Sequence, residues 1–294
     1  LDALLKSADI DLLVFDIQDI GARFYTYIWS MFDALAACAR CGIAFMVLDR
    51  PNPITGLHPS GPTLDPAFSS FVGRVPLLLR HSMTVGELAR LFNSQFVPQQ
   101  TGRPAQLSVI PMTGWRRDLY LDDTDLVWVP PSPNMPDITT ALAYPGTCLF
   151  EGTTLSVGRG TASPFLTLGA PDLDAPRWVD SLNDANLPGC LFREDWFTPT
   201  ADVAKDQLCH GLQFAITDRK SFDPLLTGVT LLQSALKISD RPIWKKSGAT
   251  FDILAGSNTL RQKLSRNLSV TEIMVGWKPD EAAFAKKYHP FLLY

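Results

Sequence analysis

Several features that would assign a protein class directly are missing from this sequence of 294 residues. No apolar stretch reaches the ~18 uncharged residues that a membrane-spanning helix needs. The 26 basic and 30 acidic residues form no run of five or more, so neither nucleic acid nor an anionic membrane is an expected partner. The four histidines include no i, i+4 pair and no Cys/His cluster has zinc-ligand spacing, so no metal site is expected.

Cysteine is scarce as well, and five residues, an odd number, imply no disulfide framework in a chain of this length. Cys38 and Cys41 form a C-x-x-C pair, but they stand near the end of an apolar helical stretch rather than at a helix N-terminus. We therefore predict buried structural thiols, with redox chemistry as the alternative.

No signal peptide is visible, because residues 1–10 carry neither a basic segment nor an apolar core. These residues instead predict a helix that leads directly into a strand at Leu12, as if the chain opened inside a domain. This segment therefore does not indicate where the protein acts.

The sequence does contain enough apolar material, 46% of its residues, for two medium domains. Four prolines within residues 129–136 exclude regular structure there and mark the expected boundary. We expect an α/β protein with a Rossmann-like, parallel-sheet N-terminal domain over residues 1–138 and a C-terminal mixed α/β domain over residues 139–294.

The first domain opens with a β-α-β pattern. Residues 11–16 and 43–49 are short apolar runs that each end in an acid, as expected of parallel strands buried on both faces. Residues 22–40 between them have helical spacing. Ligands of such folds bind outside the carboxyl ends of the strands, which is where Asp16 and Asp49 fall.

The rest of the chain alternates helices and strands. Thr84 and Glu87 predict a capping box at the start of a helix, a simpler role for Glu87 than catalysis. The other expected elements are a long functional loop over residues 51–76, strands over 107–112 and 212–217, and helices over 230–237 and 254–264.

The turn after the first strand argues against a dinucleotide site. Residues 18–23, QDIGAR, lack the G-x-G-x-x-G pattern, and their acidic and bulky side chains would obstruct a pyrophosphate. A nucleotide- or sugar-phosphate-dependent enzyme nevertheless stays an alternative on this fold.

Polar residues follow the first strand. Asp16 and Gln18 point to one side of it, where they suit sugar hydroxyls or proton transfer, and Asp19 points to the other. Helix capping or an ion pair with Arg23 is the alternative for these carboxylates. Tyr25 and its neighbour two residues on face different sides of a helix, so one is expected in the core and one at the cleft.

A second polar group follows the next strand. Asp49, Arg50 and Asn52 place an acid, a guanidinium and an amide together, and the planar fork of an arginine matches a carboxylate. A structural Asp49–Arg50 pair that braces the turn is an equal alternative. His81 is either an acid/base group or a hydrogen-bonding loop residue.

The densest polar segment is FEGTTLSVGRGT, residues 150–161. Its glycines let the backbone approach a ligand closely, and an acid and a base flank hydroxyl residues. This composition is unlike that of a core strand, so it favours a role for Glu151 or Arg159 in a cleft.

Five collinear motifs closely resemble the exo-β-N-acetylmuramidase NamZ family. They are VFDIQDIGARFYTY (residues 14–27), LDRPNP (48–53), MTVGEL (83–88), SPNMP (132–136) and GRGT (158–161). The resemblance implies an exo-acting hydrolase that removes terminal β-1,4-linked N-acetylmuramic acid from peptidoglycan fragments in a cleft between its two domains. It also implies no metal or organic cofactor, and action outside the cytoplasm in secreted or periplasmic form.

The resemblance also suggests roles for individual residues. Glycosidases usually use two carboxyl groups, although an N-acetyl sugar permits attack by its own acetamide. The catalytic candidates are Asp16, Asp19, Glu151 and His81. The substrate-binding candidates are Gln18, Arg23, Tyr25, Asp49, Arg50, Asn52, Asn134 and Arg159.

The sequence departs from the family pattern at a few positions. Family chains carry an upstream Pro-Glu-His-Gly-Phe-like motif whose glutamate is a catalytic candidate, and these 294 residues do not contain it. Ser82 stands where glycine is common, and Val157 and Leu166 where glutamate is frequent. If the upstream glutamate is essential, this chain alone is inactive, so a non-catalytic muropeptide- or sugar-binding protein is the main alternative.

Overall fold

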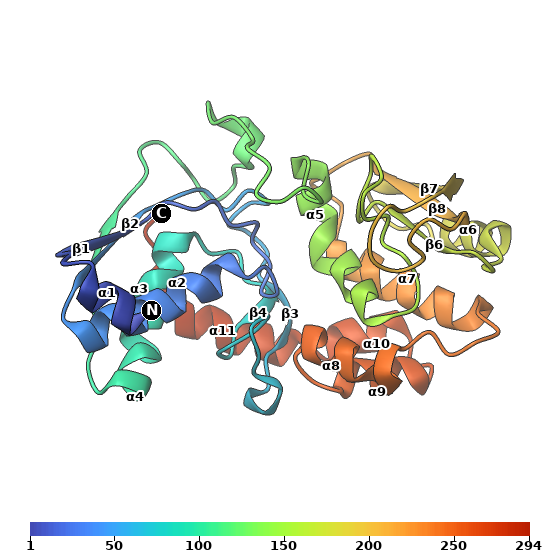
Figure 1. Ribbon diagram of the computed structural model, residues 1–294. Coiled ribbons are helices and arrows are strands. Elements are labelled where there is room, and N and C mark those ends of the chain that lie inside the picture. The colour runs from blue at the N-terminus through green and yellow to red at the C-terminus, as the bar shows by residue number, and fades with distance from the viewer. The chain divides into compact units, whose positions relative to one another are not determined.

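The computed structural model describes all 294 residues, which divide into two compact units (Figure 1). The first unit holds Leu1–Trp128 together with Pro279–Tyr294, and the second holds Val129–Lys278. The two compact units divide at the start of the proline-rich segment, and the C-terminal segment returns to the first unit.

Burial of two aromatic side chains explains this return. Helix α11 (Lys278–Tyr288) places Phe284 and Tyr288 in the hydrophobic core of the first unit. In its first turn, the Asp280 carboxylate accepts a hydrogen bond from the Thr63 amide at 3.1 Å. The short helix η5 (His289–Phe291) follows. Local periodicity does not indicate which distant core a terminal helix joins.

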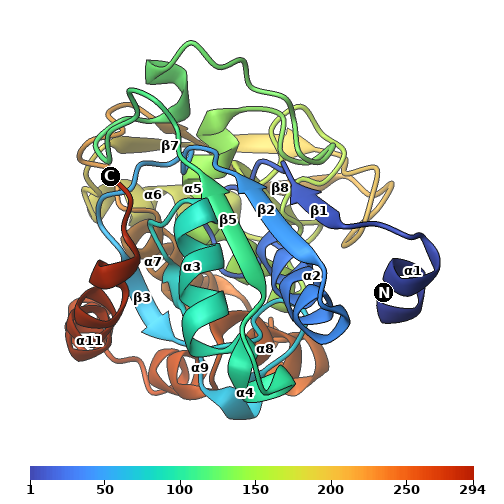
Figure 2. The same ribbon diagram turned by 90° about the vertical axis from the view of Figure 1, so that its left-hand side faces the viewer.

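The first unit is built on a parallel three-stranded sheet. Its strands are β1 (Leu12–Phe15), β2 (Ala44–Leu48) and β5 (Gln106–Ile110), in the order β1-β2-β5 (Figure 2). Helix α2 (Tyr27–Cys41) connects β1 to β2, so the predicted β-α-β unit is confirmed. The first helix, α1 (Asp2–Ser7), packs against α2.

One face of this sheet is packed and the other is open. Phe15, Phe45 and Val47 lie in the core with α2 and with helix α3 (Val85–Gln95). On the opposite face Leu12 and Val14 are 41% and 47% exposed. The expectation of strands buried on both faces is therefore wrong for this chain, because the buried residues of α2 and α3 pack with one another in the single core that Phe15, Phe45 and Val47 enter.

Helix boundaries follow local chemistry. Helix α2 starts at Tyr27 rather than at residue 22, because the preceding residues pair with a strand through an Ala22–Arg80 bridge. Helix α3 starts at the predicted capping box, with the Thr84 side chain accepting from the Glu87 amide and Glu87 accepting from the Thr84 amide.

The long loop after β2 is partly regular. Strand β3 (Ser60–Thr63) pairs antiparallel with β4 (Leu78–Arg80). The remaining short elements of this unit are η1 (Pro66–Phe68), α4 (Val97–Thr101) and η2 (Leu121–Asp123).

The second unit has an antiparallel sheet, so it is the expected mixed α/β domain. Strands β6 (Thr167–Ala170), β7 (Cys190–Phe197) and β8 (Cys209–Ile216) lie in the order β6-β8-β7. Its larger helices are α5 (Ile138–Thr147), α6 (Ala175–Asp184) and α7 (Pro224–Ile238), and α6 contacts both β7 and β8. The short helix η3 (Cys148–Gly152) continues α5.

The helix predicted over residues 254–264 is two helices. Helix α8 (Ala249–Ala255) ends at Gly256, whose φ of 80° is left-handed, and α9 (Thr259–Ser265) begins beyond it. The glycine therefore acts as a helix stop. The flanking elements are η4 (Lys245–Gly248) and α10 (Val270–Val275).

All five cysteines are free, and only Cys41 is not buried. Burial raises the pKa of the Cys38 thiol to about 11, so this sulfur stays protonated near neutral pH. The prediction of buried thiols is therefore confirmed for Cys38 and is wrong for Cys41, which is only partly buried. No helix here combines the length and apolar composition that crossing a bilayer requires.

Candidate active site

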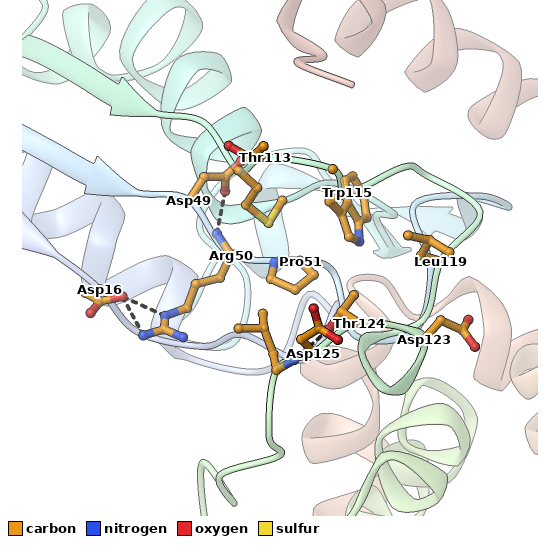
Figure 3. Close-up of a pocket in the computed structure, with 13 residues that line it drawn as sticks. Asp16, Asp49, Arg50, Pro51, Thr113, Trp115, Leu119, Asp123, Thr124 and Asp125 are labelled. Carbon is orange, nitrogen blue, oxygen red and sulfur yellow. Dashed lines mark hydrogen bonds and ion pairs between the residues drawn. The ribbon is translucent and has the colours of Figure 1, made fainter.

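A pocket of about 640 Å³ opens at the carboxyl ends of the three parallel strands of the first unit (Figure 3). Asp16 follows β1, Asp49 and Arg50 follow β2, and Met112 lies two residues beyond β5. Because parallel strands end at the same edge of a sheet, residues far apart in sequence meet there. The pocket lies where the β-α-β pattern predicted it.

An ion pair crosses one side of this pocket. The Arg50 guanidinium donates to a single oxygen of Asp16, from Nε at 2.7 Å and with Nη2 at 2.6 Å (Figure 3). The Arg50 and Asp16 side chains are 34% and 48% exposed. Asp16 thus pairs with Arg50 and not with Arg23, and both groups stay accessible to a ligand.

Asp49 lies next to that pair and is held in place by hydrogen bonds. Its carboxylate accepts from the Arg50 and Gly86 amides at 2.9 and 2.7 Å, and from the Thr84 and Tyr294 hydroxyls at 2.8 and 2.9 Å. Burial raises the pKa of Asp49, and these hydrogen bonds oppose the rise. A Cβ at Gly86 would lie 2.7 Å from the carboxyl carbon, so the close approach requires glycine.

Trp115 lines the pocket and was not predicted from sequence. Its ring contacts the Tyr294 ring edge-on, with centroids 5.0 Å apart. The side chain is 6% exposed, and its indole nitrogen has no hydrogen-bond partner. Figure 3 shows that nitrogen directed toward the side of the pocket occupied by Pro51 and Leu119. The indole nitrogen is therefore a buried donor beside the pocket that solvent does not reach.

The other pocket residues missed by sequence reasoning belong to the irregular segment after β5. They include Leu119, Asp123, Thr124, Asp125 and Leu126. The segment combines carboxylates and apolar side chains but no recognisable motif. Only its position after a parallel strand could have indicated it.

Asp19 and His81 form a buried pair that does not line the pocket. His81 Nε2 lies 3.5 Å from Asp19 Oδ2, which also accepts from the Gly21 amide at 2.7 Å. The Met83 amide donates to His81 Nδ1 at 3.2 Å, which places the proton of a neutral ring on Nε2, facing Asp19. The other oxygen of Asp19 has no partner.

Three of the predicted substrate contacts bind backbone carbonyls, and a fourth is buried. Gln18 donates to the carbonyls of Asp19 and Pro51, and Asn52 to that of Met83 at 3.1 Å. Arg23 is fully buried and donates to the Pro62 and Leu77 carbonyls; burial lowers its pKa to about 9. Tyr25 is buried against Tyr27. These four side chains hold the loops around the strand ends together.

The second unit carries the other predicted cluster. Arg159 donates through Nε to Glu151 at 2.7 Å and forms a close second contact with the same oxygen. The Cys148 thiol lies 3.5 Å from the second Glu151 oxygen, and the Arg159 guanidinium lies 5.1 Å from the Phe165 ring centroid. Asn134 accepts from the Gly160 amide at 3.0 Å. Glu151, Arg159 and Asn134 thus belong to one local structure.

No group of three or more His, Cys, Asp or Glu side chains is arranged to hold a metal ion. The predicted residues fall into four groups. Asp16, Asp49 and Arg50 line the pocket, and Asp19 and His81 form a buried pair. The loops at the strand ends hold Gln18, Arg23, Tyr25 and Asn52, and the cluster of the second unit holds Asn134, Glu151 and Arg159.

A two-unit α/β protein with a polar pocket at the carboxyl ends of parallel strands belongs to a broad class that binds small polar ligands. Within that class the family is defined by sequence. This chain belongs to the exo-β-N-acetylmuramidase NamZ family, whose N-terminal model matches residues 3–139 and whose C-terminal model matches residues 142–294.

Relatives support this assignment over the full chain. The peptidoglycan β-N-acetylmuramidase NamZ of Bacillus subtilis (strain 168) is 43% identical over 286 residues, which cover 97% of this chain and 68% of that protein. A DUF1343 family protein from Bacteroides fragilis NCTC 9343 has a crystal structure with a TM-score of 0.88 and 32% identity, covering 100% of this chain and 77% of that one. The crystal structure of a second DUF1343 family protein from the same organism has a TM-score of 0.81 and 31% identity, and the match covers 99% of this chain and 77% of that one.

Proposed function

We propose that this chain is an exo-acting glycoside hydrolase that releases terminal β-1,4-linked N-acetylmuramic acid from peptidoglycan fragments. The observation that carries the proposal is the 43% identity with the Bacillus subtilis enzyme across 97% of this chain. Both units take part in the match. Peptidoglycan lies outside the cytoplasm, so we extend the proposal to action there.

Hydrolysis adds water across the glycosidic bond, with a proton going to the leaving oxygen and a hydroxyl to the anomeric carbon. A carboxyl group normally supplies the proton, and a second carboxylate or the sugar's own acetamide assists at the anomeric carbon. Asp16 is the catalytic candidate that lines the pocket of the first unit. We assign it the proton-transfer role.

The remaining acids suit different roles. Asp19 and His81 are buried and hold the turn after β1 through the Gly21 and Met83 amides, so we assign them to positioning Asp16. Glu151 lies in the second unit, where it is one-fifth exposed and pairs with Arg159, and it stays a catalytic candidate.

The test is turnover of a chromogenic β-N-acetylmuramide by the wild-type chain and by Asp16→Asn. A lost general acid or base lowers kcat by about 10²–10⁴-fold, with the far-UV circular dichroism unchanged. Asp2→Asn is a matched control, because Asp2 pairs with Arg40 at 2.6 Å at similar exposure but away from the pocket.

Two results would contradict these assignments. Unchanged kcat in Asp16→Asn would remove Asp16 from the chemistry. Binding of muropeptides by the wild-type chain without any turnover would favour the non-catalytic sugar-binding alternative.

A further inference from the structure

The pocket of the first unit contains a single cationic side chain. Of its 13 lining residues, Arg50 is the only lysine, arginine or histidine. Four carboxylates share the same lining: Asp16, Asp49, Asp123 and Asp125. A ligand that carries a negative charge therefore has one group to which it can bind, and the other charges of the lining repel it.

The carboxylates differ in their relation to Arg50. Asp49 takes the backbone amide of Arg50 and is saturated by three further donors, so it does not compete for the guanidinium. Asp16 alone holds the guanidinium, through one oxygen. Because both side chains are at least one-third exposed, this pair is weak and readily exchanged for another carboxylate.

The rest of the lining suits the body of an N-acetylated sugar. Pro51 and Leu119 provide apolar surface, and the buried Trp115 indole nitrogen faces them without a partner. Solvent does not reach that nitrogen, so the Trp115 ring contributes apolar surface rather than a hydrogen bond to a ligand. The exposed Asp125 carboxylate can accept hydrogen bonds from the hydroxyl groups of a sugar.

We propose that Arg50 selects the acidic sugar by ion-pair exchange: the ligand's carboxylate replaces Asp16 on the guanidinium, and Asp16 is released into the pocket. The proposal rests on the proposed function, because it assigns the lactyl carboxylate of N-acetylmuramic acid to Arg50. The exchange couples recognition to chemistry, since the carboxylate assigned to proton transfer becomes free when the correct substrate binds.

Isothermal titration calorimetry with two free sugars tests the exchange. N-acetylmuramic acid carries the lactyl carboxylate and N-acetylglucosamine lacks it, so the ratio of their Kd values reports the contribution of that group. In Arg50→Gln the preference of the wild type for N-acetylmuramic acid should fall by about 10–100-fold, the range of a charge-assisted hydrogen bond. Arg40→Gln, which breaks a comparable pair outside the pocket, should leave the ratio unchanged.

Asp16→Asn should change the affinity for N-acetylmuramic acid in the opposite direction. This result distinguishes ion-pair exchange from a direct contact between Asp16 and the ligand. Removal of the internal competitor should tighten N-acetylmuramic acid binding by about 3–10-fold relative to N-acetylglucosamine binding. Weaker binding of the acidic sugar in this variant would mean that Asp16 holds the ligand, which overturns the exchange. An unchanged preference in Arg50→Gln would overturn the role of Arg50.

Failure of this inference differs from failure of the proposed function. Selective binding of N-acetylmuramic acid that is lost in Arg50→Gln, without turnover of the chromogenic muramide, would support the inference and reject the hydrolase. Turnover by a wild type whose binding shows no preference between the two sugars would retain the hydrolase and reject the inference.

Discussion

Each unit of this protein carries one arginine–carboxylate pair from a predicted motif, and the two pairs differ in their surroundings. The Asp16–Arg50 side chains are 48% and 34% exposed and line a pocket. The Glu151–Arg159 side chains are 20% and 27% exposed and contact a buried thiol and an aromatic ring. The same chemical pair is open to exchange in one unit and enclosed by its neighbours in the other.

The enclosure of the second pair has an electrostatic consequence. Burial alone would lower the pKa of Arg159, but the charge and hydrogen bonds of Glu151 outweigh burial and raise it. The ion pair with Glu151 therefore keeps the Arg159 guanidinium charged in spite of its burial. The open pair is more exposed to water and depends less on its partner for stability.

The largest expected effect of breaking these pairs is on stability. Glu151→Gln should lower the free energy of unfolding by about 2 kcal/mol, below the ~3–5 kcal/mol of a fully buried broken pair because water reaches part of it. Asp16→Asn should cost less than about 1 kcal/mol, as exposed pairs do. Differential scanning calorimetry of both variants makes the comparison, and equal losses would remove the distinction between an open and an enclosed pair.

The open pair could be predicted from the sequence to a useful extent. Short apolar runs ending in Asp16 and Asp49 indicated parallel strands, and parallel strands end at one edge, so these residues had to meet. The capping box at Thr84 was equally predictable from the sequence, because its interactions are local.

Other parts of the site depend on contacts that no local pattern encodes. Tyr294 reaches Asp49 and Trp115 from the end of the chain, and tertiary packing alone brings it there. Arg23 and Asn52 looked like ligand contacts, but they bind backbone carbonyls. A polar residue in a loop motif has the same signature in sequence whether it binds a substrate or supports the loop.

An effect of intermediate size is expected at Cys148, the thiol next to the enclosed pair. Burial first, and the Glu151 charge second, raise the pKa of Cys148 well above its ordinary value. We expect Cys148 to resist iodoacetamide at pH 8. The Arg159 charge lowers the pKa of Cys148, so its loss alone would slow alkylation. We nevertheless expect Arg159→Gln to raise the alkylation rate about tenfold, because a loosened cluster gives the reagent access to the thiol. Peptide mass spectrometry measures the rate at each cysteine.

Two controls accompany this labelling. Cys41, the one cysteine that is not buried, reports that the reagent is active in every sample. Arg50→Gln breaks the open pair in the other unit and should leave Cys148 unreactive. Equal protection of Cys148 in wild type and Arg159→Gln would show that the pair does not close the cluster.

The smallest expected effect is the pH dependence of the stability contributed by Asp49, the residue that supports the open pair. The folded-state pKa of Asp49 is raised by burial above the ordinary value of 3.8. The stability that this group contributes is thus fully present below pH 3.8 and is lost as the pH rises through the folded-state pKa. Asp49→Asn does not titrate and should cost about 1 kcal/mol, mainly in hydroxyl hydrogen bonds. Its cost should be larger at pH 4 than at pH 7 in urea denaturation.

Asp2 provides the opposite case in the same unit. Its hydrogen bond with Arg40 lowers the pKa of Asp2, so its contribution to stability is present above pH 3.8 and is lost as the pH falls through the folded-state pKa. The cost of Asp2→Asn should therefore shrink on acidification while that of Asp49→Asn grows. If both costs moved in the same direction, neighbouring charges rather than burial would determine the pKa of Asp49. The support that Asp49 gives to Arg50 would then need another explanation.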